Sequence, residues 1–119
     1  MKTPEWVERL FRVIDNKDAD GFVSFLTDDA VFTFGNQEPV KGKAAIREAV
    51  KGFFESIRAL DHDIIETWVH PESVICRGTA TYTRHDSSLL SVPFVNVFKM
   101  DAELIKEYLI YVDASQLYS

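Results

Sequence analysis

The stretch KAAIREAVKGFFESIRALDHDIIETWV, residues 43–69, contains the change of hydrophobic period that decides the fold. In its first half, apolar residues such as Ile46, Val50 and Phe54 recur at helical spacing, which predicts an amphipathic helix over residues 43–57. From residue 59 onward apolar and polar residues alternate, which is the period of a β-strand. The sequence therefore predicts a helix followed directly by a sheet.

Three more strand-like runs follow the run at 59–69, over residues 73–84, 89–100 and 104–113. The segments between them are short and turn-like, so we expect antiparallel neighbours. Ahead of residue 43, the sequence predicts a helix with Thr3 as N-cap and Pro4 at its first position, and a short helix capped by Asp18. A turn at 27–29 and a strand at 30–34 complete the pattern.

This order predicts an α+β fold over residues 1–119, a single domain in which three N-terminal helices pack on one face of a strongly bent antiparallel sheet. Such a sheet leaves one end of the core open, where a pocket can form. The aromatic residues on its strands and helices either fill the core or line that pocket. They are Phe11, Phe34, Trp68, Phe94, Phe98 and Tyr108.

Composition excludes several classes of function. With 13 Lys and Arg against 19 Asp and Glu, the net charge of −6 argues against a nucleic-acid partner. A single cysteine, Cys76, excludes an intrachain disulfide framework. The three histidines lack metal-ligand spacing, so we expect neither a metal nor a cofactor. The chain shows neither a signal peptide nor a membrane-spanning run, and we expect a cytoplasmic protein.

Strand alternation selects the candidate polar residues of the pocket. His62 and Trp68 share one face of their strand, and Asn96 interrupts an otherwise apolar row. A buried amide needs hydrogen-bond partners, which a ligand in a cavity would supply. His62 is either an ordinary sheet histidine or a general acid or base, and Asp15 is either a solvated helix-end residue or its orienting partner. Arg77 is either a surface ion pair or a group that polarises a carbonyl.

Several local phrases resemble the SnoaL-like branch of the nuclear transport factor 2-like superfamily. They include Asp18-Ala19-Asp20-Gly21, Asp28-Asp29-Ala30-Val31, Gly42-Lys43-Ala44-Ala45-Ile46-Arg47, Leu60-Asp61-His62 and Ile110-Tyr111-Val112-Asp113. The resemblance covers nearly the whole chain. It implies a cone-shaped sheet around a deep apolar pocket, and a dimer through the outer face of the sheet. Members include isomerases, dehydratases, epoxide hydrolases, polyketide cyclases and binding proteins without activity.

Carried over residue by residue, the resemblance implies that the catalytic residues of two member groups are only partly kept. The carboxylate base of ketosteroid isomerases falls at Phe34, their oxyanion-hole tyrosine at Leu10 and their protonated aspartate at Asn96. Arg77 matches the arginine of limonene epoxide hydrolases, but their carboxylates fall at Thr79 and Ile110.

The pattern of scytalone dehydratase is better kept. Its helix-end aspartate resembles Asp15 and a strand histidine resembles His62, while its second histidine falls near Arg84.

The sequence thus predicts a pocket protein for a small apolar molecule. The first hypothesis is a lyase, isomerase or cyclase in which Asp15 orients His62 for acid–base chemistry. The alternatives are a binder without turnover and a dimeric interaction domain whose cone is filled by its own side chains. Expected ligand-contacting residues are Asn96, Arg77, Thr79, Phe11, Ile14, Phe34, Trp68, Phe94, Tyr108 and Ile110. We expect a homodimer, because an outer face with Ile65, Val69, Val95, Leu109 and Tyr111 is apolar for a surface in solvent.

Overall fold

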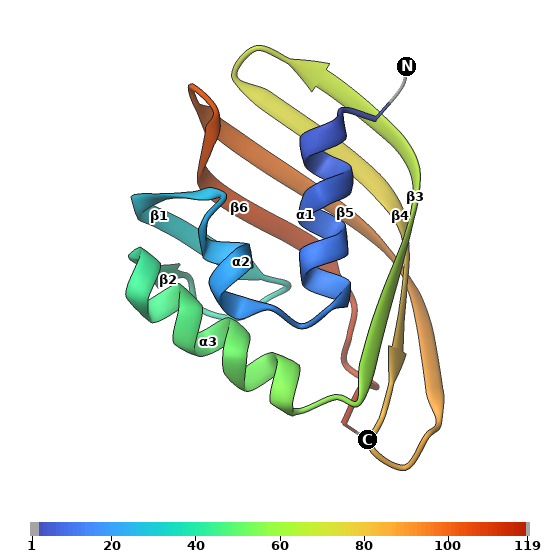
Figure 1. Ribbon diagram of the computed structural model, residues 1–119. Coiled ribbons are helices and arrows are strands. Elements are labelled where there is room, and N and C mark those ends of the chain that lie inside the picture. The colour runs from blue at the N-terminus through green and yellow to red at the C-terminus, as the bar shows by residue number, and fades with distance from the viewer. Residues whose placement is uncertain (1–2, 119) are drawn as a thin grey trace.

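The computed structural model describes residues 3–118, which form three helices packed on the concave side of a curved six-stranded sheet (Figure 1). The strand order across the sheet is β2-β1-β6-β5-β4-β3. In chain order the elements are α1 (Glu5–Asp15), α2 (Ala19–Val23), β1 (Leu26–Phe34), β2 (Val40–Lys41), α3 (Lys43–Glu55), β3 (Ala59–His70), β4 (Ser73–Thr83), β5 (Leu89–Asp101) and β6 (Leu104–Val112). The α+β fold predicted from the sequence is confirmed.

Helix α1 lies across the middle of the sheet (Figure 1) and buries one stripe of side chains. These are Val7, Leu10, Phe11 and Ile14, at the expected helical spacing. The predicted N-cap is wrong: Pro4 is the capping residue and no side chain caps the helix. The Thr3 hydroxyl lies 2.7 Å from the Thr67 hydroxyl of β3 instead, because Thr3 is one residue too early to reach the first free N–H groups.

The two other helices begin where the sequence predicts. The Asp18 carboxylate accepts a hydrogen bond from the Gly21 N–H at 2.9 Å and caps α2. Helix α3 buries Ile46, Val50 and Phe54 and ends at Glu55, two residues before the expected end. Both helices therefore turn their apolar stripes toward the inside of the curved sheet.

Strand β1 is longer than predicted, and its pairing differs. It begins at Leu26, which is fully buried and pairs with Ile105 of β6, so the expected turn at 27–29 is wrong. The register with β6 shifts between Leu26 and Val31, and this irregularity leaves the acidic side chains of Asp28 and Asp29 exposed. The β1–β6 pair is parallel, whereas all other neighbouring strands are antiparallel as expected.

A β-bulge at Ile65 changes which residues of β3 face the core. His62 pairs with the buried Ala80, but the register with β4 shifts between Ile64 and Glu66. Beyond the shift, Thr67 faces inward at 1% exposure, and Trp68 lies outside at 45%. The expectation that Trp68 shares a face with His62 is therefore wrong, since one extra residue reverses the alternation.

Candidate active site

The concave face of the sheet and the helices enclose a cavity of about 560 Å³. Its wall carries side chains from α1, α2, α3 and all six strands, and its rim is formed by residues 35–38 and by the C-terminal segment 113–118. Seven of the residues expected from the sequence line it: Ile14, Phe34, His62, Phe94, Asn96, Tyr108 and Ile110. The void is larger than the ~300 Å³ that small-molecule sites usually require.

Asp15 contacts His62, which lines this cavity, whereas Asp15 itself is not among the lining residues. Asp15 is the last residue of α1 and His62 lies near the start of β3, so helix-to-sheet packing brings them together. The Nδ1 atom of His62 lies 2.7 Å from Oδ1 of Asp15, and the backbone N–H of His62 donates to Oδ2 of Asp15 at 3.1 Å. Both carboxylate oxygens are thus engaged by the same residue, which fixes the imidazole relative to its strand.

This contact defines the tautomer of His62. An ionised carboxylate only accepts hydrogen bonds, so Nδ1 carries the proton in the neutral ring, and Nε2 is left as an acceptor without a partner within residues 3–118. The imidazole packs against the ring of Phe11 at 4.9 Å between centroids and the ring of Phe94 at 5.2 Å. Its side chain is 10% exposed, whereas that of Asp15 is 23% exposed. Such a nitrogen, backed by a carboxylate in apolar surroundings, can accept a proton from a bound molecule.

Asn96 is the second polar feature of the wall. It is 2% exposed, and its Nδ2 donates to the Tyr108 hydroxyl at a long 3.4 Å. Its Oδ1 has no hydrogen-bond partner among the residues that the structure describes. Burial first, then the nearby Cys76 and Asp15, raise the pKa of Tyr108 well above its usual range. Burial likewise raises the pKa of the Cys76 thiol to about 12. Both groups keep their protons at neutral pH.

Four expected ligand-contacting residues do not line the cavity. Phe11 stands behind the imidazole and supports it. Trp68 lies on the outer face because of the bulge. Arg77 pairs with Glu66 across the strands, Nε to Oε1 at 3.0 Å, and Thr79 lies opposite the exposed Asp63.

The prediction that Arg77 and Thr79 contact the ligand is wrong, because their row of β4 faces away from the cavity. The row that faces inward is the alternate one: Cys76, Gly78, Ala80 and Tyr82. Its small, apolar composition is the sequence signal that distinguishes it from the charged and hydroxylated row of Arg77, Thr79 and Thr81.

The sequence reasoning did not single out a further group of lining side chains from α2, α3, β1, β2, β4 and the C-terminal segment. They are Phe22, Phe53, Phe32, Val40, Tyr82 and Leu117. Most are apolar residues whose periodicity predicts burial but does not distinguish a filled core from a cavity wall. Leu117, at 2% exposure, follows the last strand and carries no periodic signal.

The C-terminal segment is fastened over the rim by one guanidinium group. Arg84, just after β4, donates from Nε to the carbonyl oxygen of Leu117 at 2.9 Å and from Nη2 to that of Gln116 at 2.8 Å. The hydroxyl groups of Tyr118 and Ser56 lie 2.7 Å apart. These contacts hold residues 116–118 against the end of the sheet, where Leu117 and Tyr118 line the cavity.

Two negative findings concern residues 3–118. In that range no three His, Cys, Asp or Glu side chains are grouped closely enough to bind a metal ion. None of the helices described there has the length and apolar character needed to span a bilayer.

Comparisons with known proteins identify the fold. The chain superposes on an NTF2-like protein of unknown function from Burkholderia pseudomallei with a TM-score of 0.85 and 14% identity, covering 95% of this chain and 92% of that one. It superposes equally well, at 0.85 and 13% identity, on a protein with a ketosteroid isomerase-like fold from Catenulispora acidiphila in complex with trimethylamine, with coverages of 92% and 86%.

A third structure, TerC co-crystallised with polyporic acid, gives a TM-score of 0.81 at 16% identity, with coverages of 96% and 93%. At these identities the likeness establishes the fold alone. No curated protein sequence matches the chain significantly.

The sequence profile of one domain family matches residues 7–108, which is most of the chain and includes Asp15, His62 and Asn96. Its description, a SnoaL-like domain, agrees with the curved sheet, the helices inside it and the cavity between them. The protein belongs to the SnoaL-like domain family.

Proposed function

We propose that the protein is a cofactor-independent lyase, isomerase or cyclase that binds a small apolar, oxygenated molecule and transfers a proton with His62. The observation that carries the proposal is the 2.7 Å contact between His62 Nδ1 and Asp15 Oδ1 at the wall of a 560 Å³ cavity. Asp15 holds the ring so that Nε2 is the free nitrogen. It also stabilises the imidazolium that forms when Nε2 takes a proton.

A general reporter of base catalysis tests this without knowledge of the substrate. 5-Nitrobenzisoxazole opens to a coloured phenolate when a base in an apolar site removes its ring proton. We expect the protein to accelerate this opening and His62→Gln to lower the rate by about 10²-fold or more, the usual contribution of general base catalysis. The control is His70→Gln, which alters an exposed histidine outside the cavity lining. Equal rates in the two variants would refute the role of His62.

A binding protein without turnover is the second candidate. It is favoured by the cavity wall itself, in which Phe34 and Ile110 are apolar and His62 is the sole histidine among the described lining residues. This candidate predicts that apolar probes bind the protein while the reporter rate stays at the level of the solution. The same assay therefore separates the two functions.

We also propose that two copies associate through the outer face of the sheet. Trp68, Ile75, Val97 and Leu109 lie next to one another across β3, β4, β5 and β6 and form an apolar row on that face. We expect Val97→Arg to convert a dimer to a monomer in sedimentation experiments, with Thr81→Arg on the same face as control. A monomer in the unaltered protein would end this proposal.

We also propose, from the sequence, that the protein is cytoplasmic.

A further inference from the structure

We infer that Asn96 is a recognition site for a hydroxyl group of an uncharged ligand, and that the cavity selects alcohols over carboxylates of the same shape. The inference rests on the proposed function, because it requires a small molecule in the cavity. It adds the chemical class of that molecule, an uncharged alcohol, and the protein atom that binds its hydroxyl group, Oδ1 of Asn96.

The first step is the unpartnered amide oxygen. Asn96 is 2% exposed and lines the cavity, yet its Oδ1 has no partner among residues 3–118. Buried polar groups in folded proteins are nearly always hydrogen-bonded, because leaving one unmade costs stability. The other buried polar side chain, Thr67, has a partner in Thr3 at 2.7 Å. Asn96 is therefore the buried group for which a ligand completes the hydrogen bonding.

The unpartnered oxygen of Asn96 determines which chemical group of a ligand can bind to it. An amide oxygen only accepts, so the ligand must donate. A hydroxyl donates and also accepts, and the Tyr108 hydroxyl beside Asn96 keeps a proton that it can give. If the side-chain amide of Asn96 were flipped by about 180°, the Tyr108 hydroxyl would donate to Oδ1. Nδ2 would then be the unpartnered atom, and it would donate to a carbonyl group of the ligand. A matched alcohol and ketone distinguish the two orientations.

The charged side chains around the cavity disfavour an anionic ligand. Among the described residues that line the cavity there is no lysine or arginine, while Glu38 and Asp113 stand at the rim. A carboxylate would pass two like charges and then lose its hydration beside Asn96 without a cation to pair with. The nearest basic side chain in the wall, His62, already has its Nδ1 engaged by Asp15. An uncharged molecule meets none of these costs.

Asn96 lies apart from the Asp15–His62 pair along the sheet. His62 pairs with Ala80 and Asn96 pairs with Cys76, so the two rows are four residues apart along β4. At about 3.4 Å per residue this is roughly 14 Å of strand. The hydroxyl held by Asn96 is therefore an anchor distinct from the group that reacts at His62.

A stability measurement tests the first step in the protein alone. Asn96→Leu removes the unpartnered Oδ1 and only the long 3.4 Å hydrogen bond from Nδ2 to Tyr108, so it is expected to keep or raise Tm. The isosteric control Thr67→Val breaks a made hydrogen bond and should lower Tm by about 3–6 °C. Asn96→Ala, which adds no bulk, serves if the leucine is not accommodated. A fall in Tm for both Asn96 variants as large as that of Thr67→Val would overturn the inference.

A binding measurement tests the selectivity with four molecules that share one ring system: tetralin, 2-tetralol, 2-tetralone and tetrahydro-2-naphthoic acid. Titrations are followed by two-dimensional NMR at pH 7. We expect 2-tetralol to bind about tenfold more tightly than the acid and more tightly than the ketone. Asn96→Leu should weaken 2-tetralol about tenfold and leave tetralin within about twofold, which is the effect of one hydrogen bond.

The outcomes are distinct. Two outcomes overturn the inference and leave the proposed function standing. In one, tetralin binds and 2-tetralol binds no more tightly than the other molecules. In the other, Asn96→Leu leaves the affinity for 2-tetralol unchanged. Tighter binding of the ketone or the acid also overturns it. Failure of all four molecules to bind the unaltered protein overturns both the inference and the proposed function.

Discussion

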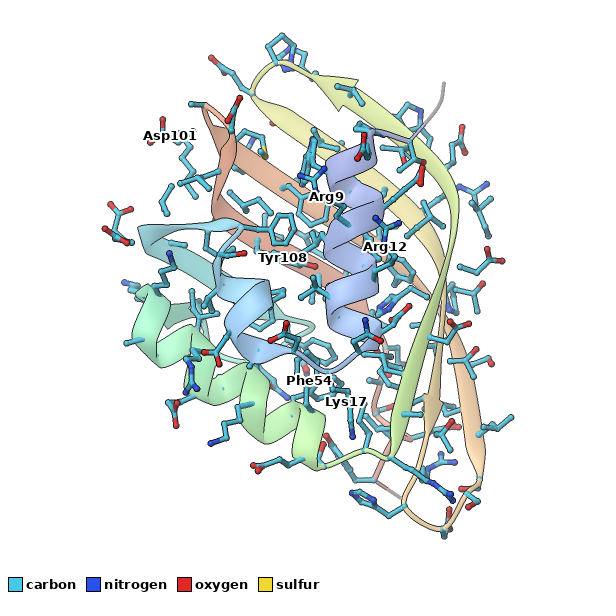
Figure 2. All side chains as sticks on the ribbon, in the orientation of Figure 1. Arg9, Arg12, Lys17, Phe54, Asp101 and Tyr108 are labelled. Atoms are coloured by element: carbon cyan, nitrogen blue, oxygen red, sulfur yellow. The ribbon has the colours of Figure 1, made fainter. Side chains whose placement is uncertain are left out.

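Lys17 connects the end of α1 to the end of α3, two residues after the catalytic candidate Asp15. Its Nζ donates to the carbonyl oxygens of Phe54 at 3.3 Å, Ile57 at 3.0 Å and Arg58 at 3.1 Å, and Figure 2 shows it close to Phe54 at that helix end. The last carbonyls of a helix have no partner within the helix, and a cation there is favourable. One side chain thus fixes the loop that positions the dyad.

We expect Lys17→Met to lower the free energy of unfolding by about 1–3 kcal/mol, because hydrogen bonds from a charged group contribute more than neutral ones. Urea denaturation of the two proteins measures the difference. Lys51→Met, on the exposed face of α3, is the control and should change stability by less than about 0.5 kcal/mol. Equal stability of the two variants would show that the three contacts contribute nothing.

At this scale the sequence predicted part of the site for a physical reason. Strand alternation placed His62 and Asn96 on inward faces, since polar residues in apolar rows are visible without a structure. Alternation alone does not say which of the two rows in β4 faces inward. The small, apolar composition of the row from Cys76 to Tyr82 indicates it, and Arg77, of the other row, lies outside the cavity. The unpartnered state of the Asn96 oxygen depends on atomic positions, which no pattern contains.

At the scale of elements, the β3–β4 pair depends on a glycine opposite a bulge. Gly78 pairs with Ile64, where the register shifts, and a Cβ at position 78 would lie 2.0 Å from the carbonyl oxygen of Asp63. That contact is with backbone, which cannot rotate away. A side chain at this position would therefore push the two strands apart.

Gly78→Ala should destabilise the protein by about 1–3 kcal/mol or more, the usual cost of overpacking. The matched control is Gly52→Ala in α3, where a Cβ meets nothing within 4 Å. That change should stabilise the helix by about 0.5–1 kcal/mol. Thermal unfolding of both variants gives the comparison, and similar Tm values would contradict the close approach seen here.

Arg84 makes a second prediction about an element, the C-terminal segment over the rim. Arg84→Met removes the donors to the carbonyls of Gln116 and Leu117, so we expect faster amide exchange over residues 114–118 with little change in the strands. Hydrogen–deuterium exchange followed by mass spectrometry measures this. Arg58→Met, whose guanidinium contacts Ser87, is the control. Unchanged exchange in the Arg84 variant would mean that Leu117 burial alone holds the segment.

The elements themselves were predictable to within a few residues wherever the period was long and regular, as in α3 and β3–β6. The features that the sequence did not predict depend on pairing with adjacent strands. The bulge at Ile65 and the start of β1 at Leu26 are set by pairing with β4 and β6, and local sequence carries no record of those partners. The two-residue β2 is too short to produce a period.

For the molecule as a whole, a buried thiol and two buried phenol groups make the stability depend on pH in the alkaline range. Burial raises the pKa of Cys76 from 9.0 and that of Tyr82 from 10.0, each to about 12, and that of Tyr108 well above 10.0. Since these pKa values are higher in the folded state, the stability they contribute is complete below pH 9 and is lost as pH rises.

We expect the free energy of unfolding to fall between about pH 9 and 12, each group adding about 1.4 kcal/mol per pH unit once its unfolded form ionises. Tyr82→Phe should make that fall less steep above pH 10, while Tyr111→Phe, on the exposed outer face, should not. Urea titrations at successive pH values measure the slopes. Identical slopes in the two variants would contradict the buried state of Tyr82.

The central claim is that Asp15 holds His62 with a free Nε2 facing an accessible cavity. Long-range ¹H–¹⁵N NMR of the imidazole tests it most directly, in the unaltered protein and in Asp15→Asn, with and without 2-tetralone. The account predicts that the neutral form of the ring carries its proton on Nδ1, that the Nε2 resonance shifts when the probe is added, and that the fixed tautomer is lost in Asp15→Asn. An Nε2–H tautomer would contradict it, and so would imidazole resonances that change neither with the probe nor with the substitution.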